Sequence, residues 1–162
     1  MQGGVILFRG TGTDARRYVE ADRSRADDYY LSDSPGVRYT VLDATGEARS
    51  VRELGADEYA GWVDWINPDT GEQMGRPRVA GPDRLGSARF AEMTINGPKS
   101  LSIAAALHPE VSEALDRAQQ DALGEIQRWL AQHSVTRVGP RGKQEAVPVE
   151  HMQVVGITHR TS

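Results

Sequence analysis

Cysteine is absent from this sequence, and so are long apolar runs. Without cysteine the chain forms no disulfide and no thiolate metal site. The longest apolar runs, such as residues 103–107, are far shorter than the roughly 20 residues that a membrane-spanning helix needs. No charged and then apolar leader segment opens the chain. We therefore expect a soluble, cytoplasmic protein with no membrane segment.

Lysine is scarce as well, since only Lys99 and Lys143 are lysines among the 19 basic residues. Arginine suits phosphate recognition because its planar guanidinium offers paired donors, although an arginine bias also follows from genome base composition. The net charge of −4 argues against a protein that coats nucleic acid without selectivity. Two stretches are nonetheless locally basic, residues 76–89 and residues 137–143.

The remaining composition is that of a globular domain. With 162 residues, of which 38% are hydrophobic and 26% charged, the chain is long enough for a single core. Helix-capping signals and three-to-four spacing predict helices that begin near residues 14, 57, 99 and 109, and residues 67–87 are expected to form an exposed loop. Short apolar or alternating runs predict strands over residues 4–8, 37–42, 47–52, 90–95, 134–138 and 147–158. Because helices and strands do not alternate regularly, we expect an α+β fold in which helices pack mainly on one face of an antiparallel sheet.

The helix that begins at Pro109 is long and amphipathic. Its apolar residues recur at 4-3-4-4-3 spacing, which predicts a single core-facing stripe. The stripe consists of Val111, Leu115, Ala118, Ala122, Ile126 and Trp129.

Tyrosine and histidine are the residues that suggest chemistry. Three of the five tyrosines, Tyr18, Tyr29 and Tyr30, fall within thirteen residues. Ordinary packing with a wet hydroxyl explains such residues, and the alternative is a nucleophilic phenol that forms a covalent intermediate. Because a free phenol titrates at about pH 10, such a nucleophile needs a base or a polarising metal. None of the four histidines lies at metal-ligand spacing from another, so spacing alone makes His159 a surface residue.

Four segments carry a more specific signal. They are A-R-R-Y-V-E (15–20) with A-D-D-Y-Y (26–30), N-P-D-T-G-E-Q-M-G-R (67–76), E-M-T-I-N-G-P-K-S (92–100) and I-T-H-R-T-S (157–162). In this order they resemble the N-terminal relaxase domain of MobF-type conjugative relaxases, the TrwC/TraI-like proteins. The third segment is the most specific, since it is similar to the family's Asp-Leu-Thr-Phe-Ser-x-Pro-Lys-Ser signature. We expect residues 1–162 to form one relaxase-like domain, the N-terminal part of a larger protein.

The resemblance implies a relaxase-like α+β fold of the HUH type and a site- and strand-specific single-stranded DNA transesterase. Tyr18 would attack a scissile phosphodiester at a plasmid transfer origin and leave a 5′-phosphotyrosyl bond, and Tyr29 or Tyr30 would serve a second strand transfer. Glu92 would orient a histidine or help to deprotonate the tyrosine. The implied partners are single-stranded DNA with a hairpin at the transfer origin and other conjugation proteins, in the bacterial cytoplasm.

The resemblance also implies a divalent metal, Mg²⁺ or Mn²⁺, that polarises the phosphate. His159 would be the first of its three histidine ligands. Phosphate contacts would come from Arg76, Arg78 and Lys99.

The sequence departs from the family pattern in three places. Glu92 stands where the family usually has an aspartate, and Val19 stands where relatives often have a second tyrosine. The family's other metal histidines form a His-x-His motif beyond the first, whereas this sequence ends three residues after His159. We therefore expect a fold that is incomplete at its C-terminal end and a metal site that is weak or absent, because one imidazole holds these hard ions poorly.

Two other functions stay open. The chain could be a catalytically incomplete relaxase remnant that binds single-stranded or hairpin DNA, or a structural or partner-binding α+β domain whose tyrosines only pack.

Overall fold

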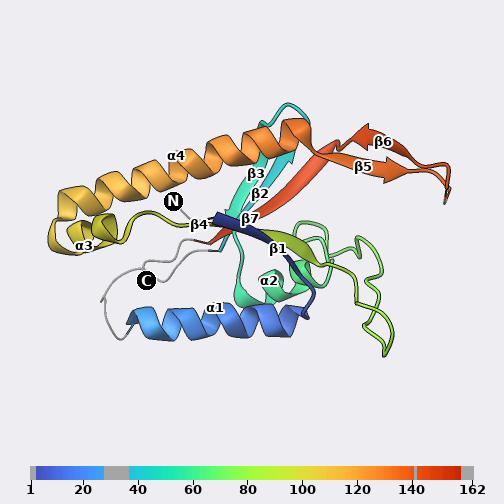
Figure 1. Ribbon diagram of the computed structural model, residues 1–162, viewed down its shortest axis with the longest axis horizontal. Coiled ribbons are helices and arrows are strands. Elements are labelled where there is room, and N and C mark those ends of the chain that lie inside the picture. The colour runs from blue at the N-terminus through green and yellow to red at the C-terminus, as the bar shows by residue number, and fades with distance from the viewer. Residues whose placement is uncertain (1–2, 28–36, 141, 158–162) are drawn as a thin grey trace. The chain divides into compact units, whose positions relative to one another are not determined.

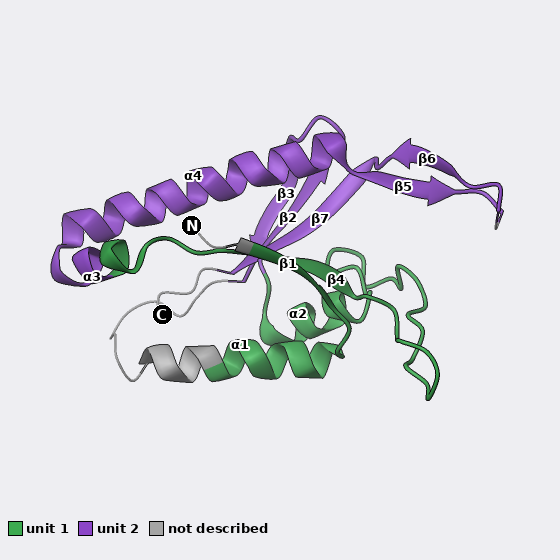
Figure 2. Cartoon of the chain, viewed as in Figure 1, with its two compact units in different colours: residues 1–36, 54–102, 158–162 green, residues 37–53, 103–157 purple. Residues whose placement is uncertain are grey.

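The computed structural model describes residues 3–27, 37–140 and 142–157. Within them the chain forms seven strands and four helices (Figure 1). It divides into two compact units, shown in Figure 2. Unit 1 comprises residues 1–36, 54–102 and 158–162, and unit 2 comprises residues 37–53 and 103–157. The elements are β1 (Gly3–Phe8), α1 (Gly12–Asp27), β2 (Val37–Asp43), β3 (Ala48–Glu53), α2 (Ala56–Val63), β4 (Phe90–Ile95), α3 (Lys99–Leu107), α4 (Pro109–His133), β5 (Val135–Val138), β6 (Glu145–Pro148) and β7 (His151–Ile157).

Unit 1 is built on an antiparallel pair of strands, β1 and β4, with Phe8 opposite Phe90 and Ile6 opposite Glu92. The two phenylalanine rings stack with their centroids 4.8 Å apart, and Phe90 also stacks on Trp62 of α2 at 5.7 Å. Aromatic stacking therefore joins the strand pair to α2.

The predicted helix start in unit 1 is confirmed, because Thr11 and Asp14 cap each other. The Asp14 carboxylate accepts hydrogen bonds from the Thr11 backbone N–H at 2.9 Å and from its hydroxyl at 2.7 Å, while the Asp14 N–H donates to the hydroxyl oxygen at 3.2 Å. These bonds also lower the pKa of Asp14. The cap satisfies donors that the first helical turn leaves unpaired.

Unit 2 is built on the antiparallel sheet β3-β2-β7, in which β2 pairs with both neighbours. Its central strand supplies most of the unit's buried core, with Val37, Tyr39 and Leu42. The predicted hairpin between β2 and β3 is confirmed, and it turns through Gly46 at a φ of +85°, a conformation that favours glycine. A β2 residue, Asp43, anchors this turn by accepting hydrogen bonds from the N–H and hydroxyl of Thr45 and the N–H of Glu47.

Helix α4 packs on this sheet, but not through the predicted stripe. Its buried residues are Gln127 and Ala131, whereas Ala118, Ala122 and Trp129 are exposed. The orientation is set by close contacts with the sheet, since a Cβ on Gly156 would meet Leu123 at 2.8 Å. The prediction of a core-facing Trp129 was wrong because α4 carries small and apolar residues on more than one face.

A second expectation also fails, since residues 147–158 do not form one strand. Strand β6 pairs with β5 in a separate two-stranded hairpin, and β7 pairs with β2. The break falls between them, where the Val149 N–H donates to the carbonyl of Ser134 at 3.2 Å.

The predicted fold class is confirmed, since the protein is α+β with antiparallel sheets and four helices in the described part. Among the described residues, no helix combines the length and apolar character needed to cross a membrane.

Candidate active site

Tyr18 lies in the second turn of α1, as the capping signal predicts. Ala15 and Val19 fix the buried side of this helix, and Tyr18 stands at the border of that side with 64% of its surface exposed. A phenol in this position is anchored by a packed helix and is still open to a macromolecular substrate.

Glu92 lies on β4, two residues after Phe90, so the two side chains leave the same face of the strand. Phe90 uses that face to stack on Trp62 of α2. Glu92 is half-buried, and its side chain therefore leaves β4 on the α2 side. Strand β4 thus positions the Glu92 carboxylate, while helix α1 positions Tyr18.

Tyr59 interacts with both of these residues, and no motif in the sequence marks it as a site residue. It lies on α2, 6% exposed, with its ring stacked on Trp62 at 6.2 Å. The pKa of Tyr59 is raised to about 12, mainly by burial and further by the Glu92 carboxylate and by Tyr18. Tyr59 is therefore close enough to Glu92 and to Tyr18 to interact electrostatically with each of them, and it keeps its proton at neutral pH.

The signal that could have identified Tyr59 was a tyrosine at an inner position of a short amphipathic helix. A buried tyrosine usually has a partner for its hydroxyl. The spacing of apolar residues predicts which face of α2 is buried, but it does not predict which residues from other elements contact that face.

A junction of three segments holds α1 against α2 and against the start of β4. The Gly12 N–H donates to the Asp64 carboxylate at 3.1 Å, and the Arg89 guanidinium lies 3.6 Å from the same carboxylate. Arg89 is partly buried, with 11% of its side chain exposed. At Gly12 a Cβ would lie only 2.0 Å from the carbonyl oxygen of Ala60, so the first turn of α1 touches the backbone of α2.

Arg89 also joins the end of β1 to the segment after α2. Its backbone N–H donates to the Phe8 carbonyl at 2.7 Å, and its carbonyl accepts from the Trp65 indole at 2.9 Å. No local sequence pattern predicts this junction, because its hydrogen bonds join residues that are far apart in the chain.

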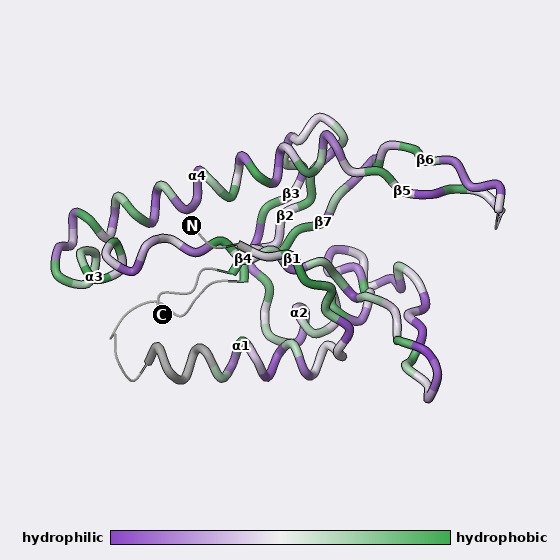
Figure 3. Tube along the Cα trace, viewed as in Figure 1, coloured by the Kyte–Doolittle hydropathy of each residue, from purple (hydrophilic) through white to green (hydrophobic). Residues whose placement is uncertain are grey.

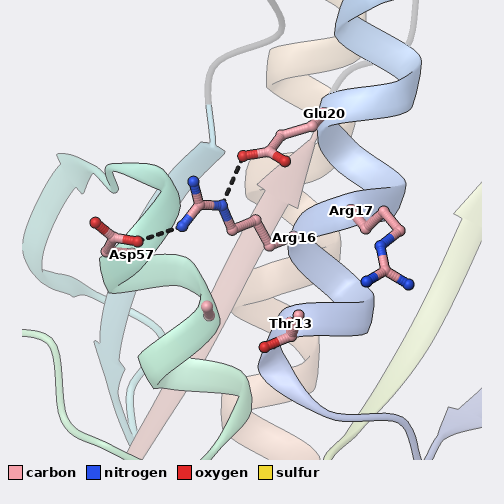
Figure 4. A pocket seen from close by; sticks show the side chains of 6 residues that line it. Thr13, Arg16, Arg17, Glu20 and Asp57 are labelled. Atoms are coloured by element: carbon pink, nitrogen blue, oxygen red, sulfur yellow. Dashed lines mark hydrogen bonds and ion pairs between the residues drawn. The ribbon is translucent and has the colours of Figure 1, made fainter.

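A shallow polar groove of about 350 Å³ lies on unit 1 beside α1 and α2. Within it Arg16 is neutralised by Glu20 and Asp57, while Arg17 points away from that cluster (Figure 4). Arg17 forms no ion pair with any residue that the structure describes. Arg17, which precedes Tyr18 in the sequence, can therefore bind an anionic ligand in the groove.

The three predicted phosphate contacts are all exposed and belong to unit 1. Arg76 and Arg78 lie in the loop between α2 and β4, and Lys99 opens α3. The Gln73 side chain holds the start of this loop, because its amide donates to the backbone carbonyls of Asp64, Trp65 and Gly75.

The other predicted site residues, Tyr29, Tyr30 and His159, lie outside the described residues. In the described ranges, no three His, Asp or Glu side chains come together in a way that could hold a metal ion.

Comparison with known proteins supplies the family. The family model of the TrwC relaxase matches residues 12–162, a range that includes Tyr18, Tyr59 and Glu92. No curated protein matches the chain. The family implies single-stranded DNA nicking in conjugative transfer. The match confirms the resemblance to MobF-type relaxases, and the chain belongs to the TrwC relaxase family.

Proposed function

We propose that this chain nicks and joins single-stranded DNA at a plasmid transfer origin, with Tyr18 as the nucleophile. The observation that carries the proposal is the cluster of Tyr18, Tyr59 and Glu92 in unit 1, where an exposed phenol and a carboxylate each interact electrostatically with the same buried, protonated phenol. We also propose that residues 1–162 belong to one relaxase domain of a larger protein in the bacterial cytoplasm.

The proposed reaction is a transesterification. The Tyr18 hydroxyl oxygen forms a bond to the scissile phosphorus while the bond from phosphorus to the 3′-oxygen breaks. The 5′ end of the DNA stays on the protein as a phosphotyrosine, and the 3′-oxygen leaves with a proton as a free hydroxyl. Glu92 accepts the proton of Tyr18 and delivers it to the departing 3′-oxygen, and when the strand is rejoined Glu92 carries the proton from the 3′-hydroxyl back to the tyrosine.

Tyr59 supports this reaction because its hydroxyl stays protonated at neutral pH. Because its pKa is about 12, its hydroxyl stays a donor when Glu92 carries charge. A fixed donor beside a carboxylate favours one orientation of that carboxylate, which matters because the longer side chain of glutamate has more freedom than aspartate.

Three further roles belong to the same proposal. The second strand transfer would use Tyr29 or Tyr30. The phosphates on either side of the scissile bond, including those of a hairpin at the origin, would contact Arg76, Arg78 and Lys99. A divalent metal, with His159 among its ligands, would polarise the scissile phosphate when bound.

The test uses a labelled single-stranded oligonucleotide that carries a transfer origin, incubated with the protein and Mg²⁺ or Mn²⁺. We expect a covalent protein–DNA adduct that resists denaturation and is lost in Tyr18→Phe. The matched variants Tyr29→Phe and Tyr30→Phe should still form it. An adduct that persists in Tyr18→Phe contradicts the assignment. Binding of the oligonucleotide without any adduct would favour the alternative of a DNA-binding protein that does not cut.

A further inference from the structure

One large aromatic side chain in unit 2 is exposed and does not pack into the core of the unit. Trp129 of α4 is 59% exposed. Gln127 and Ala131 mark the side of α4 that packs on the sheet, and Trp129 is two residues from each. Two residues correspond to about 200° around a helix, so Trp129 points away from the sheet. Its ring adds little to the core of this unit.

The Trp129 ring is nevertheless held in place. It stacks on the His133 ring with centroids 4.5 Å apart and planes 16° from parallel. The His133 Nδ1 lies 2.8 Å from the Trp129 carbonyl oxygen, and a carbonyl only accepts, so Nδ1 carries the hydrogen. This bond fixes the imidazole, which covers one face of the indole. Trp129 stays 59% exposed with this stack in place, so part of the indole is open to a ligand.

The hairpin β5–β6, which follows α4 directly, adds positive charge to the same unit (Figure 1). Arg137 and Lys143 are exposed, and neither forms an ion pair within the described part of the chain. Arg128 differs, since its guanidinium is paired with Glu125. The basic turn seen in the sequence thus keeps two unneutralised cations close in the chain to an exposed aromatic stack.

We infer that single-stranded nucleic acid binds a second surface, in unit 2, formed by Trp129, His133, Arg137 and Lys143. A nucleobase stacks on the open face of Trp129, and neighbouring phosphates lie at the two cations. Flat aromatic rings together with backbone-tracking cations are the usual means of holding single strands, because every base has a face that stacks. Duplex DNA does not fit this surface, because its bases stack on each other and leave no base face for Trp129.

The inference rests on the proposed function for the choice of DNA, but it uses residues that the proposed reaction does not. In Figure 3 hydrophilic residues predominate toward the turn of the hairpin, while α4 alternates between hydrophobic and hydrophilic residues. Nicking involves unit 1 and forms a covalent bond, whereas this surface changes only the equilibrium affinity for DNA.

The experiment is titration of a fluorescent oligothymidylate of about 16 nucleotides with the protein, without divalent metal, read by anisotropy. We expect Trp129→Ala to weaken binding about 5- to 150-fold, which corresponds to about 1–3 kcal/mol for one stacked base. Trp129→Phe keeps an aromatic face and should retain most of the affinity. The control Leu107→Ala removes an exposed apolar side chain outside this surface and should bind like the wild type.

A second arm replaces the oligothymidylate with an abasic oligonucleotide of the same length. It should bind the wild type more weakly and be insensitive to Trp129→Ala. The double variant Arg137→Gln/Lys143→Gln should reduce the slope of log affinity against log salt by about 1.4, since each phosphate contact to a single strand contributes about 0.7. Trp129→Ala binding within twofold of the wild type would overturn the inference, as would an equal loss for the abasic strand. Because no adduct is measured, a failure here is distinct from a failure of Tyr18 to react.

Discussion

The two units of this protein differ in which elements carry their buried apolar residues. In unit 2 a strand with neighbours on both sides supplies a buried core, including Leu42 at 3% exposure. In unit 1 the strand pair β1–β4 leaves its apolar side chains largely exposed, with Leu7 at 55%. The buried residues of unit 1 lie on its helices instead, with Ala15 and Val19 on α1 and Val63 on α2, and aromatic stacking, a helix cap and the junction at Asp64 add to this packing. Since Tyr18 and Glu92 both lie in unit 1, the candidate chemistry depends on the packing of these helices and on the strand pair.

The largest expected effect comes from breaking the closest contact of unit 1. Gly12→Ala would place a Cβ 2.0 Å from the Ala60 carbonyl oxygen, so α1 must separate from α2. We expect a loss of more than about 3 kcal/mol of stability in unit 1 and loss of adduct formation. Hydrogen exchange should show lost protection in α1 and α2 and retained protection in β2 and β7.

Gly124→Ala is the matched control in unit 2. Gly124 lies within α4, and a Cβ there would meet nothing within 4 Å. Alanine should therefore stabilise the helix by about 0.5–1 kcal/mol. If Gly12→Ala left the amides of α1 protected, the contrast between the two units would be wrong.

A pair of leucine variants tests the contrast in core packing. Leu42→Ala in β2 should cost about 2–5 kcal/mol of unfolding free energy, because it leaves a cavity in a buried core. Leu7→Ala in β1 should cost less than about 1 kcal/mol, since that side chain already meets solvent. Urea unfolding of both variants measures this difference, and equal costs would contradict it.

Within unit 1, Tyr59→Phe separates the contribution of Tyr59 to the reaction from its contribution to stability. The variant keeps the ring stacked on Trp62 and removes only the hydroxyl that lies in the field of Glu92 and Tyr18. We expect about a tenfold slower adduct formation, with less than about 1 kcal/mol change in stability. Tyr59→Leu, which also removes the stack, should destabilise unit 1. A Tyr59→Phe protein that reacts at the wild-type rate would limit Tyr59 to packing.

The smallest effect concerns the pH dependence of unit 2. The pKa of Asp43 is lowered from 3.8 to about 2, first by the hydrogen bond from the Thr45 hydroxyl. A lowered carboxylate pKa means that the unfolded chain binds the proton more tightly. The stabilisation by Asp43 is thus complete above about pH 4 and is lost as the pH falls toward about 2. Urea midpoints across this range should fall more steeply for the wild type than for Asp43→Asn, and parallel curves would contradict this origin.

The sequence predicted the parts of this structure that depend on neighbouring residues. The start of α1 followed from Thr11 and Asp14, and the β2–β3 hairpin followed from its turn at residues 43–46. The buried face of α4 was predicted wrongly, because the sheet selects the face with Ala131 rather than the apolar stripe that ends at Trp129.

The candidate site divides in the same way. Tyr18 and Glu92 came from family motifs, while Tyr59 was missed because its helical spacing is equally that of a core residue. The bond between Gly12 and Asp64 spans 52 positions in the chain, and no local pattern encodes such a contact.

The most direct test of the central claim is to map the residue that becomes bonded to DNA. Trypsin cleaves after Arg17 and Arg23, so Tyr18 falls on a peptide of residues 18–23, whereas Tyr29 and Tyr30 share a peptide of residues 26–38. After nuclease digestion of the first-cleavage adduct, mass spectrometry should find the nucleotide on the 18–23 peptide. A nucleotide found only on the 26–38 peptide, or on the peptide that contains Tyr59, would contradict Tyr18 as the nucleophile.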